Sequence, residues 1–237
     1  MASAADIKDE LFAAAIPGKR EVLSSFFKTG EGQYGEGDLF IGVTVPQQRA
    51  IVKQFAPLSL DEISILLASE FHECRMTGLL FLVDLFKKDK KNESVQKEVF
   101  DFYLSYTHAI NNWDLVDLSA PQIVGDYLLS RDRSVLHKLS ESANMWERRI
   151  AIVSTYTFIK KGDFTDTFKI CDTLISDKED LLNKATGWML REVGKQDFDA
   201  EYSYLKKRYK KMSRTSLRYA IEKFEPEMRS DFLKGLI

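Results

Sequence analysis

A short pattern, one polar residue followed by small or apolar residues, recurs along this chain at a nearly constant interval. Successive copies begin 37, 37, 35 and 34 residues apart. A period in the mid-thirties is typical of stacked helix pairs, in which each pair buries its apolar face against its neighbours. The tetratricopeptide consensus is missing, so the spacing favours a HEAT-like array; chance similarity among amphipathic helices is the alternative. The copies begin at Arg75, Asn112, Arg149, Lys184 and Arg218.

Apolar spacing also predicts helices. Six segments carry apolar residues at three- and four-residue intervals, whereas the alternation expected of strands is almost absent. Ser59 or Asp61 can begin the first of these helices, and Gly162 can end the fourth. We therefore predict an all-α fold, a right-handed α-solenoid of HEAT-like repeats whose inner helices line a concave cleft. The six segments are Leu60 to Leu67, Phe71 to Phe86, Val95 to Tyr106, Trp146 to Ile159, Leu181 to Val193 and Ser216 to Phe224.

Length and composition are those of an ordinary folded protein. With 237 residues, 44% of them hydrophobic and 30% charged, the chain can bury a substantial core, and we expect residues 1–237 to form a single HEAT-like repeat domain. No apolar run reaches the roughly 18–20 residues that span a bilayer, and the first ten residues do not resemble a secretory signal. Cys74 and Cys171 fall in apolar helical contexts, which favours buried free thiols in a reducing compartment. We expect a cytoplasmic monomer with no membrane partner.

Positive charge is concentrated near the C-terminus. The basic segment, Tyr202 to Ile221, contains seven Lys or Arg and no Asp or Glu, so it carries +7 while the rest of the chain carries −9. Such a concentration favours a docking surface for a polyanion; a solvated helix face is the alternative. The tyrosines of this segment have helical spacing, which favours packing. Its basic residues include Lys210, Lys211 and Arg214.

Trp113 and Asp117 point most clearly to a chemistry. On a helix, positions i and i+4 share one face, so the indole and the carboxylate would project together. Both groups attract positive charge, the ring through its quadrupole and the carboxylate through its anion. If the repeat register holds, Arg149, Trp188 and Arg191 also lie on inner helices. The set indicates a site that stabilises a cation; a core Trp113 and a structural Asp117 cap or salt bridge are the alternatives.

Four segments of the chain form an ordered set that resembles a known family. They are Phe40-Ile41-Gly42-Val43 with Pro46 and Arg49, then Trp113-Asp114-Leu115-Val116-Asp117, Trp146-Glu147-Arg148-Arg149 and Ala185-Thr186-Gly187-Trp188-Met189-Leu190-Arg191-Glu192. No single segment is decisive, but their order and separations resemble those of the AlkD-type DNA alkylation repair glycosylases. The resemblance covers nearly the whole chain.

The resemblance implies a helical solenoid that holds duplex DNA and excises cationic N3- and N7-alkylated purines, such as 3-methyladenine and 7-methylguanine. It implies that Asp117 is the catalytic carboxylate and that Trp113 and Trp188 contact the deoxyribose and backbone of the lesion. Arg149 and Arg191 would engage the DNA backbone, and the basic segment would grip it at the cleft edge. Unlike most base-modifying enzymes, the family does not require the lesion to be flipped into a pocket.

The implied reaction suits these residue types. An alkylpurine that already carries a positive charge leaves without a general acid, while the sugar becomes oxocarbenium-like, as in glycosidases. A carboxylate about 4 Å away contributes roughly 4 kcal/mol at an effective dielectric constant near 20, or about a thousandfold in rate if most of it applies only in the transition state. Because no lysine is matched to the site, we expect a monofunctional hydrolase that forms no Schiff base.

We expect no metal and no organic cofactor. His72, His108 and His137 are scattered without metal-ligand spacing, which favours surface or packing roles for all three.

Other positions carry narrower expectations. Four glycines make Gly30 to Gly37 a mobile surface loop. Thr44 stands where some members of the family carry Gln, which departs from the family pattern. Trp146 falls off the inner register and is expected in the core, whereas Arg148 is expected to face solvent.

Two other functions stay open at this point. The chain can be a catalytically silent relative that binds DNA structure or damage, or a scaffold that grips a peptide or partner helix. Binding driven by phosphate contacts would weaken steeply with salt, whereas a scaffold would bind DNA weakly at every ionic strength.

Overall fold

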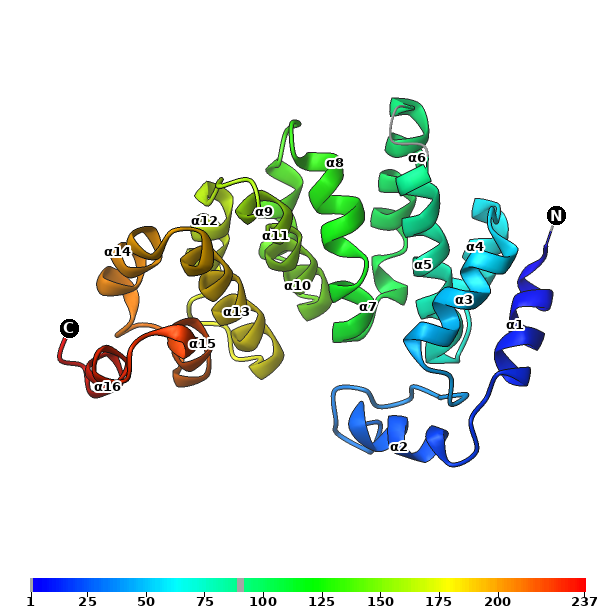
Figure 1. Cartoon of the computed structure of the whole chain (residues 1–237), viewed down its shortest axis with the longest axis horizontal. Coiled ribbons are helices and arrows are strands. Elements are labelled where there is room, and N and C mark those ends of the chain that lie inside the picture. The colour runs from blue at the N-terminus through cyan, green and yellow to red at the C-terminus, as the bar shows by residue number, and fades with distance from the viewer. Residues whose placement is uncertain (1, 89–91) are drawn as a thin grey trace. The chain divides into compact units, whose positions relative to one another are not determined.

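The computed structural model describes residues 2–88 and 92–237 of the chain. The regular structure of these residues is helical (Figure 1). Their β-type pairing is an isolated parallel bridge between Leu39 and Phe71. The predicted all-α fold is confirmed. The chain divides into two compact units, Met1–Ser119 and Ala120–Ile237, called here the first and the second unit.

The first unit is arranged around one long helix, α5, whose residues are buried along most of its length. α3, α4, α6 and α7 all pack against it. Gly78 permits the close approach of α4, because a Cβ there would lie 3.2 Å from the Leu66 Cβ. The α-helices of this unit are α1 (Ala4–Ala13), α2 (Lys19–Phe26), α3 (Val45–Phe55), α4 (Leu60–Leu67), α5 (His72–Lys88), α6 (Glu93–Ser105) and α7 (Trp113–Asp117).

Polar side chains cap the first turns of several of these helices, including α4 and α3. The Ser59 hydroxyl accepts the Glu62 N–H at the start of α4, as its position in the sequence predicts. At the start of α3, the backbone N–H and the hydroxyl of Thr44 both donate to Gln47 Oε1, at 3.0 and 2.7 Å. Thr44 therefore contributes to the beginning of its own helix.

The second unit contains three helices that contact one another in series, α10, α13 and α15. The repeat positions Arg149, Lys184 and Arg218 lie one on each of them. At Gly187 a Cβ would meet the Ser216 carbonyl oxygen, so glycine allows α13 and α15 to pack closely. The α-helices of this unit are α8 (Asp126–Leu128), α9 (Ser134–Ser140), α10 (Met145–Ser154), α11 (Tyr156–Ile159), α12 (Thr165–Thr173), α13 (Asp180–Gln196), α14 (Phe198–Arg208), α15 (Arg214–Ala220) and α16 (Pro226–Lys234).

Helices occupy all six predicted segments, and two of the segments are interrupted. The segment from Trp146 to Ile159 is split at Thr155, whose hydroxyl donates to the Ile152 carbonyl at 2.7 Å and so competes with the regular helix. The segment from Ser216 to Phe224 ends as an α-helix at Ala220 and continues as a 3₁₀ turn, Ile221–Lys223. Gly162 follows α11 with a φ of 77°, the left-handed conformation that glycine adopts easily.

Several single-residue expectations are also confirmed. Cys74 and Cys171 are buried free thiols, and burial raises the pKa of both. Trp146 is buried in the core of the second unit. In the part of the chain that the structure describes, no helix has the length and apolar character that a membrane span requires.

The loop from Gly30 to Gly37 lies at the surface of the first unit and contains no helix. Its contact with the end of α2 is close: Gly35 donates its N–H to the Lys28 carbonyl at 3.2 Å, and a Cβ at Gly35 would meet the Phe27 carbonyl. The Tyr34 hydroxyl lies 3.4 Å from the Phe26 carbonyl. The loop therefore packs against the segment that carries Phe26 and Phe27.

Candidate functional site

α7 is a helix of only five residues, and it carries Trp113 and Asp117 at its two ends. Asn112 caps it, because its side-chain oxygen accepts the Trp113 N–H at 2.8 Å. Leu115, on the opposite side of the helix, is buried, whereas Trp113 and Asp117 are both partly exposed. The two side chains thus share a face that solvent reaches, called here the α7 face.

Aromatic rings of the first unit stack against Trp113 on the side away from solvent. The Trp113 ring stacks on Phe27 with centroids 5.3 Å apart and planes 20° apart. Phe27 in turn stacks on Phe40 at 5.1 Å and contacts the His72 ring at 4.9 Å. Phe26 meets Trp113 edge-on at 6.0 Å and is 61% exposed. Phe26 and Trp113 therefore form the exposed end of an aromatic cluster that continues into the core.

A buried set of charged side chains lies beside this cluster. His72 Nδ1 is 3.0 Å from Asp38 Oδ2, and His72 Nε2 is 2.9 Å from Asp114 Oδ2. Burial opposes a charge on the imidazole, but the two carboxylates outweigh burial and raise the pKa of His72 to about 9. His72 is therefore a buried cation between two acids at neutral pH.

Arg75 completes this charged set. Its Nη2 bonds Asp38 Oδ1 at 2.5 Å and Asn111 Oδ1 at 3.1 Å, and its Nη1 donates to the Ser69 carbonyl at 2.9 Å. Burial alone would raise the pKa of Asp38, but His72 and Arg75 outweigh burial and lower it. The Asn112 Nδ2 also donates to Asp38 Oδ2, at 3.3 Å.

These residues, Asp38, His72, Arg75, Asn112 and Asp114, are called here the His72 network. The prediction of a packing role for His72 agrees with its burial. It did not include the charge of His72 or its two carboxylate partners. The sequence does contain a signal: α5 begins with His72-Glu73-Cys74-Arg75, and Asp38 directly follows the glycine-rich loop. The partners are 34 and 42 residues from His72 along the chain, so local periodicity does not pair them.

Glu73, the second residue of that α5 segment, accepts hydrogen bonds from the backbone of residues 41–43, which come shortly after the loop. Its Oε2 accepts the Ile41 N–H at 2.9 Å, and its Oε1 accepts those of Gly42 at 2.8 Å and Val43 at 3.2 Å. Gly42 has a φ of 105°, which L side chains rarely adopt. Glu73 thereby fixes the segment that follows Asp38 and Phe40.

In the second unit, the predicted site residues lie on α10 and α13. Arg149 is buried, and its Nη1 donates to the Leu181 carbonyl at 2.5 Å. Trp188 is partly exposed; its indole N–H donates to Glu192 Oε1 at 3.2 Å, and its ring contacts Tyr156 at 6.1 Å. Arg191 forms an ion pair with Glu222, while its buried Nε has no hydrogen-bond partner. Each cation is therefore already engaged within this unit.

The expectation that Arg148 faces solvent is wrong. Its side chain is largely buried, with Nε 2.8 Å from Asp177 Oδ2 and Nη1 2.8 Å from the Ser142 carbonyl. The guanidinium fork can pair with a carboxylate and a carbonyl at once, which stabilises its burial between α10 and the segment before α13.

The basic segment covers the end of α14, the following turn and α15. Lys210, Lys211 and Arg214 are exposed, and Arg214 Nη1 donates to the Leu233 carbonyl at 2.7 Å. Arg208 differs, because it pairs with Asp172 at 2.5 Å and sits over the Tyr204 ring. The packing expected of the tyrosines is confirmed for Tyr204 and Tyr209, which are buried. The other five cations, besides Arg208 and Arg214, are Lys206, Lys207, Lys210, Lys211 and Arg218.

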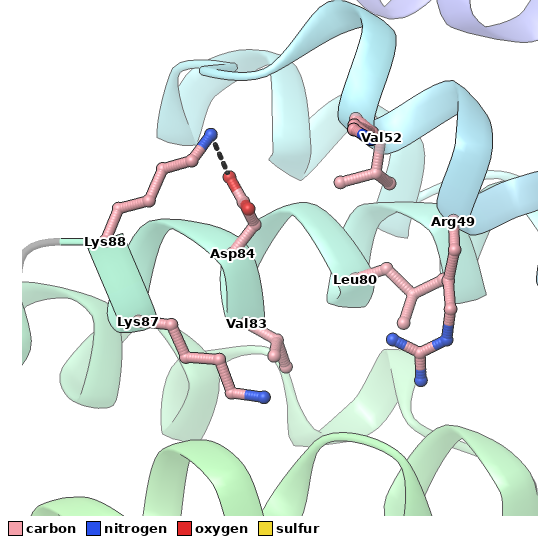
Figure 2. A pocket seen from close by; sticks show the side chains of 8 residues that line it. Arg49, Val52, Leu80, Val83, Asp84, Lys87 and Lys88 are labelled. Carbon is pink, nitrogen blue, oxygen red and sulfur yellow. Dashed lines mark ion pairs between the residues drawn. The ribbon is translucent and has the colours of Figure 1, made fainter.

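The first unit also contains a basic pocket, between α3 and α5. Its volume is about 260 Å³, and one acid and four cations line it. Figure 2 shows Arg49 extending from α3 and Lys87 from α5, with apolar side chains between them in this view. The acid, Asp84, pairs with Lys88 at 2.9 Å. The lining residues are Arg49, Val52, Lys53, Leu80, Val83, Asp84, Lys87 and Lys88.

Comparison with known proteins gives two findings. Residues 7–224 match the family described as "DNA alkylation repair enzyme". A solved structure described as "Predicted DNA alkylation repair enzyme from Enterococcus faecalis" is 16% identical, with a TM-score of 0.69 over 90% of this chain and 97% of that chain, so the two share a fold. Curated proteins give no match. Because the family match covers most of its length, the chain belongs to the DNA alkylation repair enzyme family.

Proposed function

We propose that this member of the family is a monofunctional DNA glycosylase that hydrolyses the N-glycosidic bond of cationic N3- and N7-alkylated purines in duplex DNA. Asp117 stabilises the developing charge on the sugar, and Trp113 contacts the same deoxyribose. The lesion base does not need to be flipped into a pocket. The reaction uses no metal and no organic cofactor.

The observation that supports this proposal most directly is the α7 face. Trp113 and Asp117 are partly exposed on one side of a helix whose other side is buried. A structural tryptophan would be expected inside the core, as Trp146 is at 8% exposure. A face that presents both an indole and a carboxylate to solvent suits a cationic sugar.

The chemistry can be followed at the glycosidic bond. As the C1′–N9 bond breaks, its electron pair moves to the purine, so the cationic base leaves as a neutral molecule. The positive charge moves to the sugar, where the Asp117 carboxylate opposes it. Water then attacks C1′, and its proton passes to Asp117 and on to solvent. No general acid is required, because the leaving base carries its charge from the start.

The phenol of Tyr103 lies near enough to Asp117 for the two groups to interact electrostatically. Buried Tyr103 shares a hydrogen bond with Ser119 Oγ at 3.0 Å. Burial, with a further contribution from the negative charge of Asp117, raises the pKa of Tyr103 and keeps the phenol protonated. A neutral phenol adds no second negative charge beside the Asp117 carboxylate.

In the second unit, the proposal assigns Trp188 to the lesion backbone and Arg149 and Arg191 to DNA phosphates. Arg191 is paired with Glu222, so in this proposal a phosphate takes the place of that carboxylate when DNA binds. Arg149 also holds the start of α13, because its guanidinium bonds the Leu181 carbonyl. Exposed cations of the basic segment, Lys210, Lys211 and Arg214, supply further phosphate contacts that do not depend on sequence.

Base release tests the proposed activity. The protein is incubated with a duplex that contains one 7-methylguanine, and the freed base is measured by chromatography, with an unmodified duplex as control. We expect release of the methylated base and an intact sugar-phosphate backbone. Tight, salt-sensitive binding without release would instead identify a silent DNA-binding protein. Weak duplex binding at every salt concentration would favour a protein-interaction scaffold.

A further inference from the structure

We propose that His72 is a positioning residue of the α7 face: with both ring nitrogens protonated, it bridges Asp38 and Asp114 and so holds Trp113 and Asp117 in their working orientation. This inference rests on the function proposed above for the α7 face. It assigns a role to the glycine-rich loop as well, because that loop delivers Asp38 to the bridge.

The geometry places a proton between each ring nitrogen of His72 and its carboxylate partner, and an imidazolium supplies both of these protons. A neutral imidazole offers one N–H donor and one lone pair, whereas both nitrogens of His72 lie within 3.0 Å of carboxylate oxygens. An unprotonated nitrogen facing a carboxylate would set two lone pairs against each other. Arg75 supplies the second positive charge at Asp38. Two acids are therefore balanced by two cations in a site from which water is largely excluded.

The bridge reaches α7 on both sides of Trp113. On one side, Asn112 donates to Asp38 with its Nδ2 and accepts the Trp113 N–H with its Oδ1. On the other side, Asp114 bonds His72 with Oδ2 and accepts the Leu115 N–H with Oδ1. A five-residue helix does not persist by its own hydrogen bonds, so such tertiary contacts determine where it points.

The aromatic cluster gives the same groups a second path to Trp113. The His72 ring stacks on Phe40 at 4.7 Å and contacts Phe27 at 4.9 Å, and Phe27 stacks on Trp113. Movement of the imidazole would therefore displace the ring on which the indole rests. His72 acts on the α7 face through its backbone and through its ring.

The charged groups that face His72 determine its pH dependence. They are Asp38 from the loop, Asp114 from α7 and, through Asp38, Arg75 on α5; Glu73 instead faces the N–H groups of residues 41–43. The pKa of His72 is raised from 6.5 to about 9, so the bridge contributes its full stability below the lower value and loses it as pH rises through about 9. Burial opposes this shift, and the two carboxylates overcome it.

NMR spectroscopy of the whole ¹⁵N-labelled protein tests the bridge without any enzyme assay. We expect both His72 ring nitrogens to be protonated at pH about 7.5, and the Trp113 indole N–H resonance to shift with a midpoint near pH 9. The Trp113→Phe variant assigns that resonance. A singly protonated His72 ring at neutral pH, or a Trp113 resonance that does not follow the titration of His72, would overturn the proposal.

Asp114→Asn is the matched variant for the charge. The side-chain amide introduced by this substitution can donate to a neutral Nε2 while Nδ1–H still donates to Asp38, so a neutral ring fits the altered site. We expect the Trp113 resonance to become nearly constant between pH about 7 and about 9.5 in this variant. A wild-type titration near pH 9 in Asp114→Asn would contradict the role of the bridge.

Single-turnover base release adds the functional readout. His72→Gln keeps one hydrogen bond but cannot donate to both acids, so we expect release to slow by about ten- to a hundredfold with nearly unchanged duplex affinity, the scale of loss produced by about 1 Å of misplacement. His137→Gln, which removes an ion pair with Asp166 in the second unit, is the control and should keep the wild-type rate.

The outcomes separate the two proposals. A folded His72→Gln protein with the wild-type rate and an unchanged Trp113 resonance would overturn the positioning role. If the wild-type protein releases no base, the glycosylase proposal fails, while the NMR titrations still decide whether the bridge holds α7. If His72→Gln does not fold, the wild-type and Asp114→Asn titrations decide alone.

Discussion

Trp113 combines a fixed position with an accessible surface. Phe27 stacks against its ring, Phe26 meets it edge-on, and its backbone N–H is held by Asn112. A ring held in this way loses little conformational entropy when it meets a deoxyribose. Its quadrupole then acts on the sugar only as the sugar becomes cationic, which is the condition for a rate effect.

Substitution of Trp113 measures this contribution. Trp113→Phe keeps an aromatic face on Phe27 but weakens the attraction for a cation, so we expect single-turnover base release to fall by about tenfold or less, the equivalent of about 1 kcal/mol. Trp113→Ala should lose more. Trp146→Phe is the control: it alters a core residue, so it should lower the melting temperature and leave the rate nearly unchanged.

The residues of the α7 face were predictable because their relation is local. Trp113 and Asp117 are four positions apart, and a helical period alone places them together. The His72 network was not predictable in this way, since its members come from a loop, from α5 and from α7. Arg148 shows the same limit, because its partner Asp177 is 29 residues away and only the folded chain brings them together.

At the scale of elements, small residues set how closely helices pack. Gly187 lies where α13 meets α15, and a Cβ at that position would be 2.5 Å from the Tyr219 Cβ as well as against the Ser216 carbonyl. The repeat pattern contains this glycine, and the structure gives its physical reason. The contact joins two successive copies of the repeat in the second unit.

Gly187→Ala tests this packing. We expect a loss of about 2 kcal/mol in the free energy of unfolding, since a methyl group forced into a packed interface typically costs about 1–3 kcal/mol. Gly30→Ala is the control, because its Cβ would meet only the flexible Gln33 side chain. Chemical denaturation of both variants gives the comparison. Equal stability of Gly187→Ala and wild type would show that α13 and α15 are not packed closely.

The sequence predicted where helices lie more accurately than where they end. The apolar spacing predicted α4 at Leu60–Leu67 and most of α13, where strong periodicity and a cap or a long buried face agree. The break at Thr155 depends on a hydroxyl that bonds a carbonyl of its own turn, which the apolar pattern does not show. The short helix α7 depends on its tertiary contacts and has too few residues to define a period.

At the scale of the whole molecule, the net charge is small, but positive charge is concentrated in the basic segment. A net charge of −2 would repel a polyanion weakly, yet the basic segment alone carries +7. Most of its cations are exposed, and Arg208 is ion-paired with Asp172. DNA affinity is therefore expected to depend on a few surface positions rather than on the overall charge.

Salt dependence of duplex binding tests this expectation. Each phosphate contact that is lost reduces the slope of log affinity against log salt by about 0.9. We expect the triple variant Lys210→Gln, Lys211→Gln and Arg214→Gln to lower the slope by about two to three and to weaken binding equally for all sequences. Lys97→Gln, at an exposed ion pair with Asp101 in α6, is the control and should leave the slope unchanged. A triple variant with the wild-type slope would remove the basic segment from the DNA interface.

The Asp117 carboxylate is tested most directly by the single-turnover rate of 7-methylguanine release for wild type, Asp117→Asn and the surface control Asp101→Asn, at saturating protein. The account predicts that Asp117→Asn slows release by about a hundred- to a thousandfold, because a carboxylate about 4 Å from a cationic sugar contributes roughly 4 kcal/mol. Asp101→Asn should match wild type. Release by a folded Asp117→Asn protein at a rate within about twofold of wild type would contradict the account.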